Sequence, residues 1–365
     1  MRFPEFTEEW KKCTIKDYGE VITGNTPPTK NIEYYSNGSY LWASPADLGL
    51  NKHITSTKTK LSLLGLKKTR TIPQGSILVT CIGSTIGKMG MATETMSTNQ
   101  QINSVIVNDS TNNDFAYYAI LNAFPRYLSE VGVQAVPILS KSNFEKLPNH
   151  TTTKEEQRKL GYFLNLLDER IATQNKIIEK LQSLIKGIRN NMMSQNHGDC
   201  IALQYIADIY QPKTIPSTDL TEDGYLVYGA NGIIGKYHLY NHEKEQICIT
   251  CRGNTCGTVN YTEPKSWITG NAMVINTDNF AKNVNKRYLF HYLSFINFNS
   301  IISGSGQPQI VRQPLAKLKL ILPKLTTQEH IAKCLDTILA KIKNEQTFLQ
   351  AIQIQKSYLL SQMFI

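Results

Sequence analysis

Apolar residues recur in a heptad pattern over one stretch near the middle of the chain. Between Leu160 and Met192 they alternate at steps of four and three, at positions 160, 164, 167, 171, 178, 181, 185, 188 and 192, and the polar Gln174 is the one interruption. Such an a/d pattern over more than four heptads is typical of a long helix that packs on another helix.

A second copy of the pattern ends the sequence. It runs from Ile331 to Met363, every position lies at the same constant offset from its counterpart in the first copy, and the polar gap recurs in register at Glu345. Thr153, followed by Glu156, forms a capping box that predicts where the first helix begins. The second helix is expected to begin at residue 326 or 327, where two threonines stand.

The stretches before the two helices also repeat. Both consist of short strand-like runs, such as 76–80, 104–107, 225–227 and 273–275, separated by glycine- and proline-containing turns. Residues 77–87 match residues 247–257 at six of eleven positions. We therefore predict a duplicated module in which a mixed α/β domain precedes a long helix. The expected boundaries are 1–150 (first domain), 151–196 (central helix), 197–323 (second domain) and 324–365 (C-terminal helix).

Each helix must bury its apolar stripe, and the other copy is the obvious partner. At about 40 residues a helix is about 60 Å long. If the two helices pack antiparallel, the two domains lie at opposite ends of a rod and are related by a pseudo-twofold axis. Two similar domains on a spacer suit a ligand that is read in two places, and duplex DNA is such a ligand. A coiled coil that serves only dimerisation is the alternative.

Composition narrows the choice of partner and compartment. The 365 residues include 39 Lys and Arg against 29 Asp and Glu, and the net charge of +10 favours a polyanion. Seven cysteines, an odd number spread over the whole length, argue against a disulfide framework. The N-terminus lacks the apolar core of a signal peptide, and no run reaches the 18 apolar residues of a membrane span. We expect a cytoplasmic protein without a membrane partner.

Several loops resemble catalytic motifs but fail in detail. Gly83–Lys88 has one residue too few for a phosphate-binding loop and lacks the following Ser or Thr, so a glycine-cornered turn between strands is favoured. Asn25–Thr29 resembles the Asn-Pro-Pro-aromatic loop of DNA methyltransferases but carries an extra threonine and no aromatic residue. Asp219, Glu222 and Asp223 have turn composition rather than nuclease spacing. No catalytic residue is predicted.

A metal site is not predicted either. Cys248, Cys251 and Cys256 are close in sequence, but residues three apart on a strand face opposite sides, and no fourth ligand stands at zinc spacing. We interpret these cysteines as packing residues.

The remaining polar residues are candidates for DNA contact. Lysines and arginines would bind phosphates, and amides and arginines on loops would read base edges, the loops 229–232 and 307–309 being the best placed. For any single residue, a solvated surface role is the alternative. The candidates are Thr26, Lys30, Lys58, Lys60, Lys67, Lys68, Arg70 and Lys88 in the first domain, and Lys213, Asn231, Lys236, His238, Arg252, Asn254, Gln307 and Gln309 in the second.

Taken together, these features resemble the specificity subunit of a type I restriction-modification system. The start Arg2–Phe6 followed by Trp10 is similar to the family's common start, and Gly24–Pro27 is similar to its first recognition-domain loop. Tyr228–Gly235 and Arg252–Asn254 are similar to its second-domain signature. The helical region also resembles the family's pattern, with Glu-Gln at 156–157 before the first seam and Thr-Gln at 327–328 as a departure in the second copy.

The resemblance implies an α/β (α+β) fold in which two similar target-recognition domains are separated by two long helices, packed as an antiparallel coiled coil with a pseudo-twofold. It implies that each domain reads one half of a bipartite, asymmetric DNA site and that the helices set the gap. The helices would also dock two DNA methyltransferase subunits. The interface residues would be Leu160, Leu164, Leu167, Ile171, Ile178, Leu181, Ile331, Leu335, Ile338, Ile342, Leu349 and Ile352.

On this interpretation the chain itself is non-catalytic and binds no cofactor. The resemblance implies that the methyltransferase subunits use S-adenosylmethionine to methylate adenine, and that restriction subunits with an ATP-driven motor join them as an endonuclease, with Mg²⁺. Two other hypotheses stay open: a self-contained nuclease or methyltransferase fusion, and a coiled-coil adaptor without DNA contact.

Overall fold

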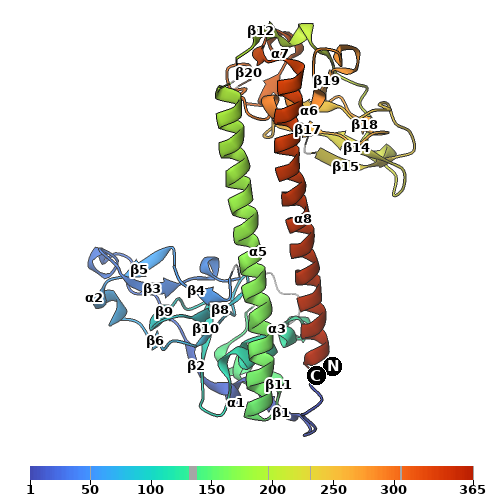
Figure 1. Cartoon of the computed structure of the whole chain (residues 1–365). Helices are drawn as coiled ribbons and strands as arrows, with labels where there is room; N and C mark the ends of the chain where they lie inside the picture. Colours follow the sequence, from blue (N-terminus) through green and yellow to red (C-terminus); the bar gives the residue numbers. More distant parts are fainter. Residues whose placement is uncertain (50, 131–137, 196, 231, 305, 365) are drawn as a thin grey trace. The chain divides into compact units, whose positions relative to one another are not determined.

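The computed structural model describes residues 1–49, 51–130, 138–195, 197–230, 232–304 and 306–364. The chain divides into two compact units, which we describe separately: unit 1 comprises Met1–Asn175 and Thr347–Ile365, and unit 2 comprises Lys176–Gln346. Two long helices belong to both units. Helix α5 (Lys154–Ser194) begins in unit 1 and ends in unit 2, whereas α8 (Leu325–Met363) begins in unit 2 and ends in unit 1 (Figure 1).

Unit 1 is built on two sheets. The first has the order β2-β10-β7-β8-β4 and the second the order β5-β3-β9-β6, while β1 and β11 form a separate pair. The strands are β1 (Lys11–Thr14), β2 (Gly19–Thr23), β3 (Tyr40–Ala43), β4 (His53–Ile54), β5 (Thr59–Leu61), β6 (Thr71–Ile72), β7 (Ile77–Thr80), β8 (Met89–Ala92), β9 (Met96–Thr98), β10 (Ile102–Val107) and β11 (Pro148–Thr151). The short helices are α1 (Ile15–Tyr18), η1 (Ile32–Tyr34), η2 (Pro45–Asp47), α2 (Leu63–Leu66), α3 (Asn113–Glu130) and α4 (Lys141–Glu145).

Unit 2 repeats this plan with one strand fewer in each of its two main sheets. Its sheets have the orders β13-β19-β16-β17 and β15-β14-β18, with the pairs β12-β22 and β20-β21 beside them. The strands are β12 (Asp199–Ala202), β13 (Asp208–Tyr210), β14 (Tyr225–Gly229), β15 (Gly232–Tyr237), β16 (Ile247–Thr250), β17 (Val259–Tyr261), β18 (Trp267–Ile268), β19 (Ala272–Asn276), β20 (Ile302–Ser303), β21 (Gln309–Ile310) and β22 (Lys319–Leu322). The short helices are η3 (Leu203–Tyr205), η4 (Ser217–Asp219), η5 (Asp278–Phe280), α6 (Lys286–Leu293) and α7 (Arg312–Ala316).

The strand pairings confirm the predicted duplication. Strand β10 lies antiparallel between β2 and β7, as β19 does between β13 and β16. Strand β3 has an antiparallel neighbour, β5, and a parallel one, β9, and β14 has the same pair in β15 and β18. The repeated sequences 77–87 and 247–257 form β7 and β16 with the turns that follow them.

Glycines shape those turns, as expected from the sequence. Gly83 and Gly87 have φ angles of +94° and +89°, and Gly253 and Gly257 have φ angles of +83° and +90°. These left-handed conformations are costly for any residue with a Cβ, so glycine recurs at both corners. The first turn joins β7 to β8, and the second joins β16 to β17.

The helix starts differ slightly from those expected. The capping box at the start of α5 is only half formed: the Glu156 N–H donates to Thr153 Oγ1 at 3.4 Å. The carboxylate of Glu156, which is fully buried, instead accepts two hydrogen bonds from Arg2, at 2.7 and 2.6 Å, and one from Thr152. Helix α8 begins at Leu325, earlier than the threonines suggested.

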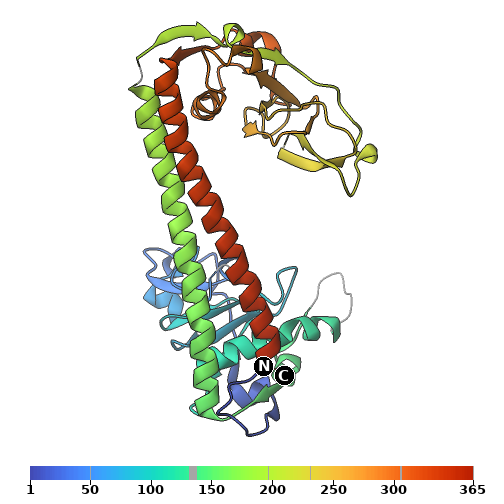
Figure 2. The same cartoon turned by 45° about the vertical axis from the view of Figure 1, so that its right-hand side comes forward.

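The heptad seam is buried within each unit, where α5 (green) and α8 (red) lie side by side (Figures 1 and 2). In unit 1, Leu160 near the start of α5 shares a core with Met363 at the end of α8. In unit 2, Ile185 late in α5 shares a core with Ile331 near the start of α8. The two helices are therefore antiparallel, as predicted.

Each predicted interface residue of the helices is shielded from solvent. Buried are Leu160, Leu164, Ile178, Ile331, Leu335, Ile342 and Ile352; half-buried are Leu167, Ile171, Leu181, Ile338 and Leu349. Gln174 is buried and Glu345 half-buried, and Lys356, a further polar position of the seam, pairs with Asp168. The residues near the helix ends, such as Leu160, Leu164 and Ile331, also pack into the domain cores, so the seam does more than join two helices.

Two glutamines at equivalent positions of the repeat attach a short helix to each long one. In unit 1, Gln157 Oε1 accepts the Asn112 N–H at 2.8 Å, just before α3. In unit 2, Gln328 Oε1 accepts the Asn285 N–H at 2.8 Å, just before α6. Both side chains are buried, and each amide nitrogen donates twice more to nearby oxygens. This contact aligns α3 with α6, so that Asp114 and Arg287 occupy equivalent positions.

A buried lysine reinforces the attachment in unit 1. Lys52 Nζ, in a side chain that is 5% exposed, pairs with Asp114 of α3 at 2.6 Å. It also donates to Asn165 Oδ1 of α5 at 3.0 Å. Tyr118 of α3 donates to Asp168 of α5 at 2.5 Å. Burial lowers the pKa of Lys52, although Asp114 acts to raise it.

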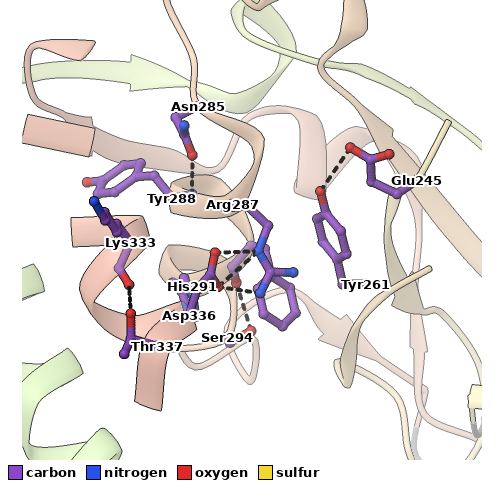
Figure 3. A network of polar contacts seen from close by, with 11 residues as sticks. Glu245, Tyr261, Asn285, Arg287, Tyr288, His291, Ser294, Lys333, Asp336 and Thr337 are labelled. Carbon is purple, nitrogen blue, oxygen red and sulfur yellow. Dashed lines mark hydrogen bonds and ion pairs between the residues drawn. The ribbon is translucent and has the colours of Figure 1, made fainter. Parts of the chain in front are cut away.

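In unit 2 the charges at this place are exchanged (Figure 3). Arg287 Nε of α6 donates to Asp336 Oδ2 of α8 at 2.9 Å, and His291 Nε2 lies 2.8 Å from Asp336 Oδ1. Asp336 occupies the position of the repeat that Asn165 holds in the first copy. Burial acts to raise the pKa of Asp336, but hydrogen bonds from His291 and Arg287 lower it to about 2. Burial lowers the pKa of His291, so that its ring is neutral at pH 7.

Candidate nucleic-acid interface

A loop that follows the edge strand β2 gathers three of the polar segments in unit 1. Asn25 joins them: its Nδ2 donates to the Lys68 carbonyl at 2.9 Å, and its Oδ1 accepts the Arg70 N–H at 2.8 Å. The indole N–H of Trp42 on β3 donates to the Asn25 carbonyl at 3.2 Å. Arg70 is held further by a bond of 2.7 Å from Nη1 to the Thr23 carbonyl. The predicted residues Thr26, Lys68 and Arg70 are thus close together.

Gln100 completes this cluster, although sequence reasoning missed it. The Thr26 hydroxyl donates to Gln100 Oε1 at 2.5 Å, and the Gln100 side chain is exposed. The available signal was the amide run 99–101 directly after β9, which has no strand or helix periodicity. Only the sheet register brings this run beside the loop, through a bond from the Asn25 N–H to the Thr98 carbonyl at 2.9 Å.

The other candidates of unit 1 lie apart from this cluster. Lys88, in the turn before β8, lines a pocket of about 540 Å³ together with Lys52 and Lys356. Four further lysines are exposed on the second sheet and around α2 and η1: Lys30, Lys58, Lys60 and Lys67. The structure therefore separates a loop cluster from a scattered basic surface.

Unit 2 has a loop at the equivalent place, after its edge strand β13. The Lys213 carbonyl accepts the indole N–H of Trp267 at 3.3 Å. Gln211 Nε2 donates to the Gly270 carbonyl at 3.0 Å and to Cys251 Sγ at 3.1 Å. Ser104 of β10 and Val274 of β19 are equivalent, since they pair with equivalent residues of β7 and β16. Ser104 also pairs with Ile22, and Val274 pairs with Tyr210. Ile22 and Tyr210 are therefore equivalent, and three residues later Lys213 is the counterpart of Asn25. Both loops are fixed by an indole at the same carbonyl, although the two tryptophans come from different strands.

The hairpin β14–β15 carries two further candidates beside exposed aromatic rings. Lys236 pairs with Asp223 at 3.7 Å, and His238 lies next to Tyr237, with ring centroids 4.1 Å apart. The rings of Tyr225 and Tyr240 are 4.9 Å apart. Asn231, a candidate from the predicted loop 229–232, lies outside the described residues.

The structure brings together two segments that are distant in sequence. Arg252 and Gln309 face each other in an antiparallel bridge, and the Gly253 N–H donates to the Pro308 carbonyl at 3.0 Å. The side chains of Arg252, Asn254, Gln307 and Gln309 are exposed. These four predicted residues therefore form one polar surface.

The cysteines of unit 2 are packing residues, as predicted. Cys248 and Cys251 are buried in two separate hydrophobic clusters, and Cys256 packs against one of them. Burial raises the pKa of Cys248 to about 12, so its thiol stays protonated. Within the part of the chain that the structure describes, no three His, Cys, Asp or Glu side chains are arranged to hold a metal ion, and no helix is long and apolar enough to cross a membrane.

Comparison with known proteins identifies relatives for both halves of the chain. The family described as "Type I restriction modification DNA specificity domain" matches residues 7–183 and 201–353. The chain is 30% identical over 183 residues to the type I restriction enzyme MjaIX specificity subunit of Methanocaldococcus jannaschii, a match that covers 48% of this chain and 42% of the relative. It is 24% identical over 338 residues to the EcoprrI specificity subunit of Escherichia coli, covering 86% and 83% of the two chains.

A third relative and two solved structures are also similar to this chain. The HindI specificity subunit of Haemophilus influenzae is 30% identical over 186 residues, which make up 48% of this chain and 40% of that subunit. The chain thus spans about two fifths of the length of the MjaIX and HindI subunits. The S subunit of a type I restriction-modification system from M. genitalium has a TM-score of 0.69 at 18% identity and covers 98% of this chain and 96% of its own. A chain from a type I R-M system complex has a TM-score of 0.59 at 14% identity, covering 96% of each chain.

Proposed function

Because this chain belongs to the type I restriction-modification DNA specificity family, we propose that it reads a bipartite, asymmetric DNA site and presents it to methyltransferase subunits. The observation that carries this proposal is the pair of equivalent loops, each fixed by an indole and each carrying exposed polar groups, in two domains of one fold. Two similar readers with different side chains suit a site whose two halves differ in sequence.

We infer that the helix pair sets the distance between the half-sites. In support, α5 and α8 both contribute side chains to the core of each unit. Helix residues that face away from the seam, including Tyr162, Leu166 and Leu184, are exposed apolar side chains. They are available to two methyltransferase subunits.

In this proposal the chain performs no chemistry itself. The methyltransferase subunits would use S-adenosylmethionine to methylate adenine, and restriction subunits would add ATP-driven cleavage with Mg²⁺. The complex would act in the cytoplasm, where its DNA lies. A fusion enzyme would instead cleave or methylate DNA as the purified chain.

The test is to express the chain with its methyltransferase partner and to map methylated adenines in genomic DNA by single-molecule sequencing. We expect one motif with two specific parts and a fixed gap. Binding of the purified complex to a duplex with this motif should weaken steeply with salt, because phosphate contacts release counterions. Absence of any motif would contradict the proposal, and salt-insensitive or absent binding would favour the coiled-coil adaptor. Cleavage by the chain alone with Mg²⁺ would favour a nuclease.

A further inference from the structure

We propose that Thr26, Arg70 and Gln100 form the base-reading cluster of unit 1, and that Asn25 and Trp42 are positioning residues that hold it. This inference rests on the proposed function, since it names the residues that read one half-site. The three readers come from three segments: the loop after β2, the residues before β6 and the turn after β9. Tertiary structure alone assembles them.

Both positioning residues direct their side-chain polar groups to backbone groups of the protein. The Asn25 side chain donates to the Lys68 carbonyl and accepts from the Arg70 N–H, and its own carbonyl accepts the Trp42 indole N–H. The Trp42 ring is buried at 9% exposure. A loop fixed in this way loses little conformational entropy on binding, which is what a precise reader requires.

Two of the readers, Arg70 and Gln100, keep hydrogen-bond donors exposed, whereas Thr26 uses its single O–H on Gln100. The Thr26 hydroxyl holds Gln100 Oε1 and so fixes the rotation of the amide. The amide nitrogen of Gln100 has no partner among the described residues. Arg70 donates one guanidinium N–H to the Thr23 carbonyl, and its side chain is exposed, so its other N–H groups can reach a ligand. A site dominated by donors matches the acceptor pair O6 and N7 of guanine in the major groove.

Unit 2 lacks the central member of this cluster. Backbone hydrogen bonds align the turn after β9 with the turn after β18. The N–H of Asn99 donates to the Ala43 carbonyl, and the N–H of Thr269 donates to the Tyr228 carbonyl. At the other end of each turn, the Cys81 N–H donates to the carbonyl of residue 101 and the Cys251 N–H to that of residue 271. Gln100 therefore has Gly270 as its counterpart, which has no side chain to offer. In place of Asn25 stands Lys213, whose side chain is exposed. The two loops share a scaffold but cannot read the same bases.

The experiment compares variants of the full chain in complex with its methyltransferase partner. The probe is a set of duplexes that carry the mapped motif and every single-base change in it. For Gln100→Ala we expect discrimination at one base pair of one half-site to fall about tenfold to hundredfold, with the other half unchanged. Arg70→Lys keeps the charge but loses the forked donors and should relax a position in the same half-site. Trp42→Phe removes the indole N–H together with part of the buried ring, and it should weaken discrimination across that half-site.

Thr26→Val removes the hydroxyl that holds Gln100 and should weaken discrimination in the same half-site. Thr214→Val in unit 2 is the matched control, and it should leave discrimination at the first half-site unchanged. A uniform loss of affinity for every sequence, with a smaller salt slope, would show that Gln100 and Arg70 bind phosphate and would overturn the inference. Unchanged discrimination in Gln100→Ala and Arg70→Lys would overturn it as well. If the wild-type complex reads no motif at all, the proposed function itself is wrong, so the two failures are distinguishable.

Discussion

The two units attach a short helix to a long helix at the same place, but the short helix carries opposite charges in the two units. In unit 1 the acid, Asp114, stands on the short helix α3, and Lys52 reaches it from the strand side, with Asn165 on the long helix. In unit 2 the base, Arg287, stands on the short helix α6, and the acid, Asp336, stands on the long helix. Combining half of one arrangement with half of the other would bring like charges together or leave a charge without its partner.

The glutamines at the same junction show no such exchange. Gln157 and Gln328 satisfy backbone N–H and carbonyl groups, which every sequence presents at a helix start. Side-chain charges need only be complementary, so both members of a pair can change together. The two copies therefore share the glutamine contacts to the backbone, but they differ in the ion pair beside them.

The largest effect should come from Asp336→Lys in unit 2. The variant places a lysine beside Arg287 at a partly buried site and removes the carboxylate that pairs with Arg287 and His291, and we expect a loss of about 4 kcal/mol in the free energy of unfolding of unit 2. Urea unfolding and hydrogen exchange of α6 would measure it. Adding Arg287→Glu should restore about half of the loss, because the pair is then reversed as a whole. No rescue in the double variant would show that the charges do not act as a pair.

A smaller and equal effect is expected for Gln157→Leu and Gln328→Leu. Each substitution leaves several buried polar groups without partners, and each should cost about 3 kcal/mol. The measurement is the loss of hydrogen-exchange protection in α3 for the first variant and in α6 for the second. A clear inequality between the two would mean that the junctions are not equivalent.

Lys52→Met in unit 1 should cost less, about 1 to 2 kcal/mol. Methionine fills much of the same volume, and the side chain of Asp114, at 30% exposure, can be hydrated when its partner is lost. Thermal unfolding of the variant beside the wild type would give the number. If Lys52→Met lost as much free energy of unfolding as Asp336→Lys, hydration of Asp114 would not compensate for the missing lysine, and the expectation would be wrong.

The smallest expected effect is a loss of stability of unit 2 when the pH is lowered. The folded state lowers the pKa of His291 from 6.5 by burial, so the unfolded chain binds more protons and unit 2 loses stability as the pH falls below 6.5. Asp336, whose pKa is about 2 against 3.8, adds a further loss of about 1 kcal/mol between pH 4 and 2. Hydrogen exchange in α6, corrected for the intrinsic pH dependence, should report the first loss between pH 6.5 and 5.

The control for this dependence is His291→Tyr, which installs the residue that unit 1 has at the equivalent position, Tyr118. The variant should abolish the loss between pH 6.5 and 5. If α6 in the variant still opens on acidification as the wild type does, another group is responsible.

The sequence predicted the duplication and the helices well because both are periodic features. The heptad positions face a seam wherever the helix is placed, and the glycine corners at Gly83 and Gly253 follow from backbone conformation alone. The capping box was only half right, since Arg2, distant in sequence, takes the carboxylate of Glu156. Local pattern cannot reveal such a competitor.

The sequence by itself therefore determined the two-domain repeat, the antiparallel helix partners and the family of the chain. Only the tertiary structure decided which polar residues meet. Trp42 and Trp267 reach equivalent carbonyls from different strands, and Gln100 joins Thr26 from a distant segment of the chain. The physical reason is that periodic burial is encoded by neighbours along the chain, whereas a hydrogen-bonded cluster of loops depends on the register of a whole sheet.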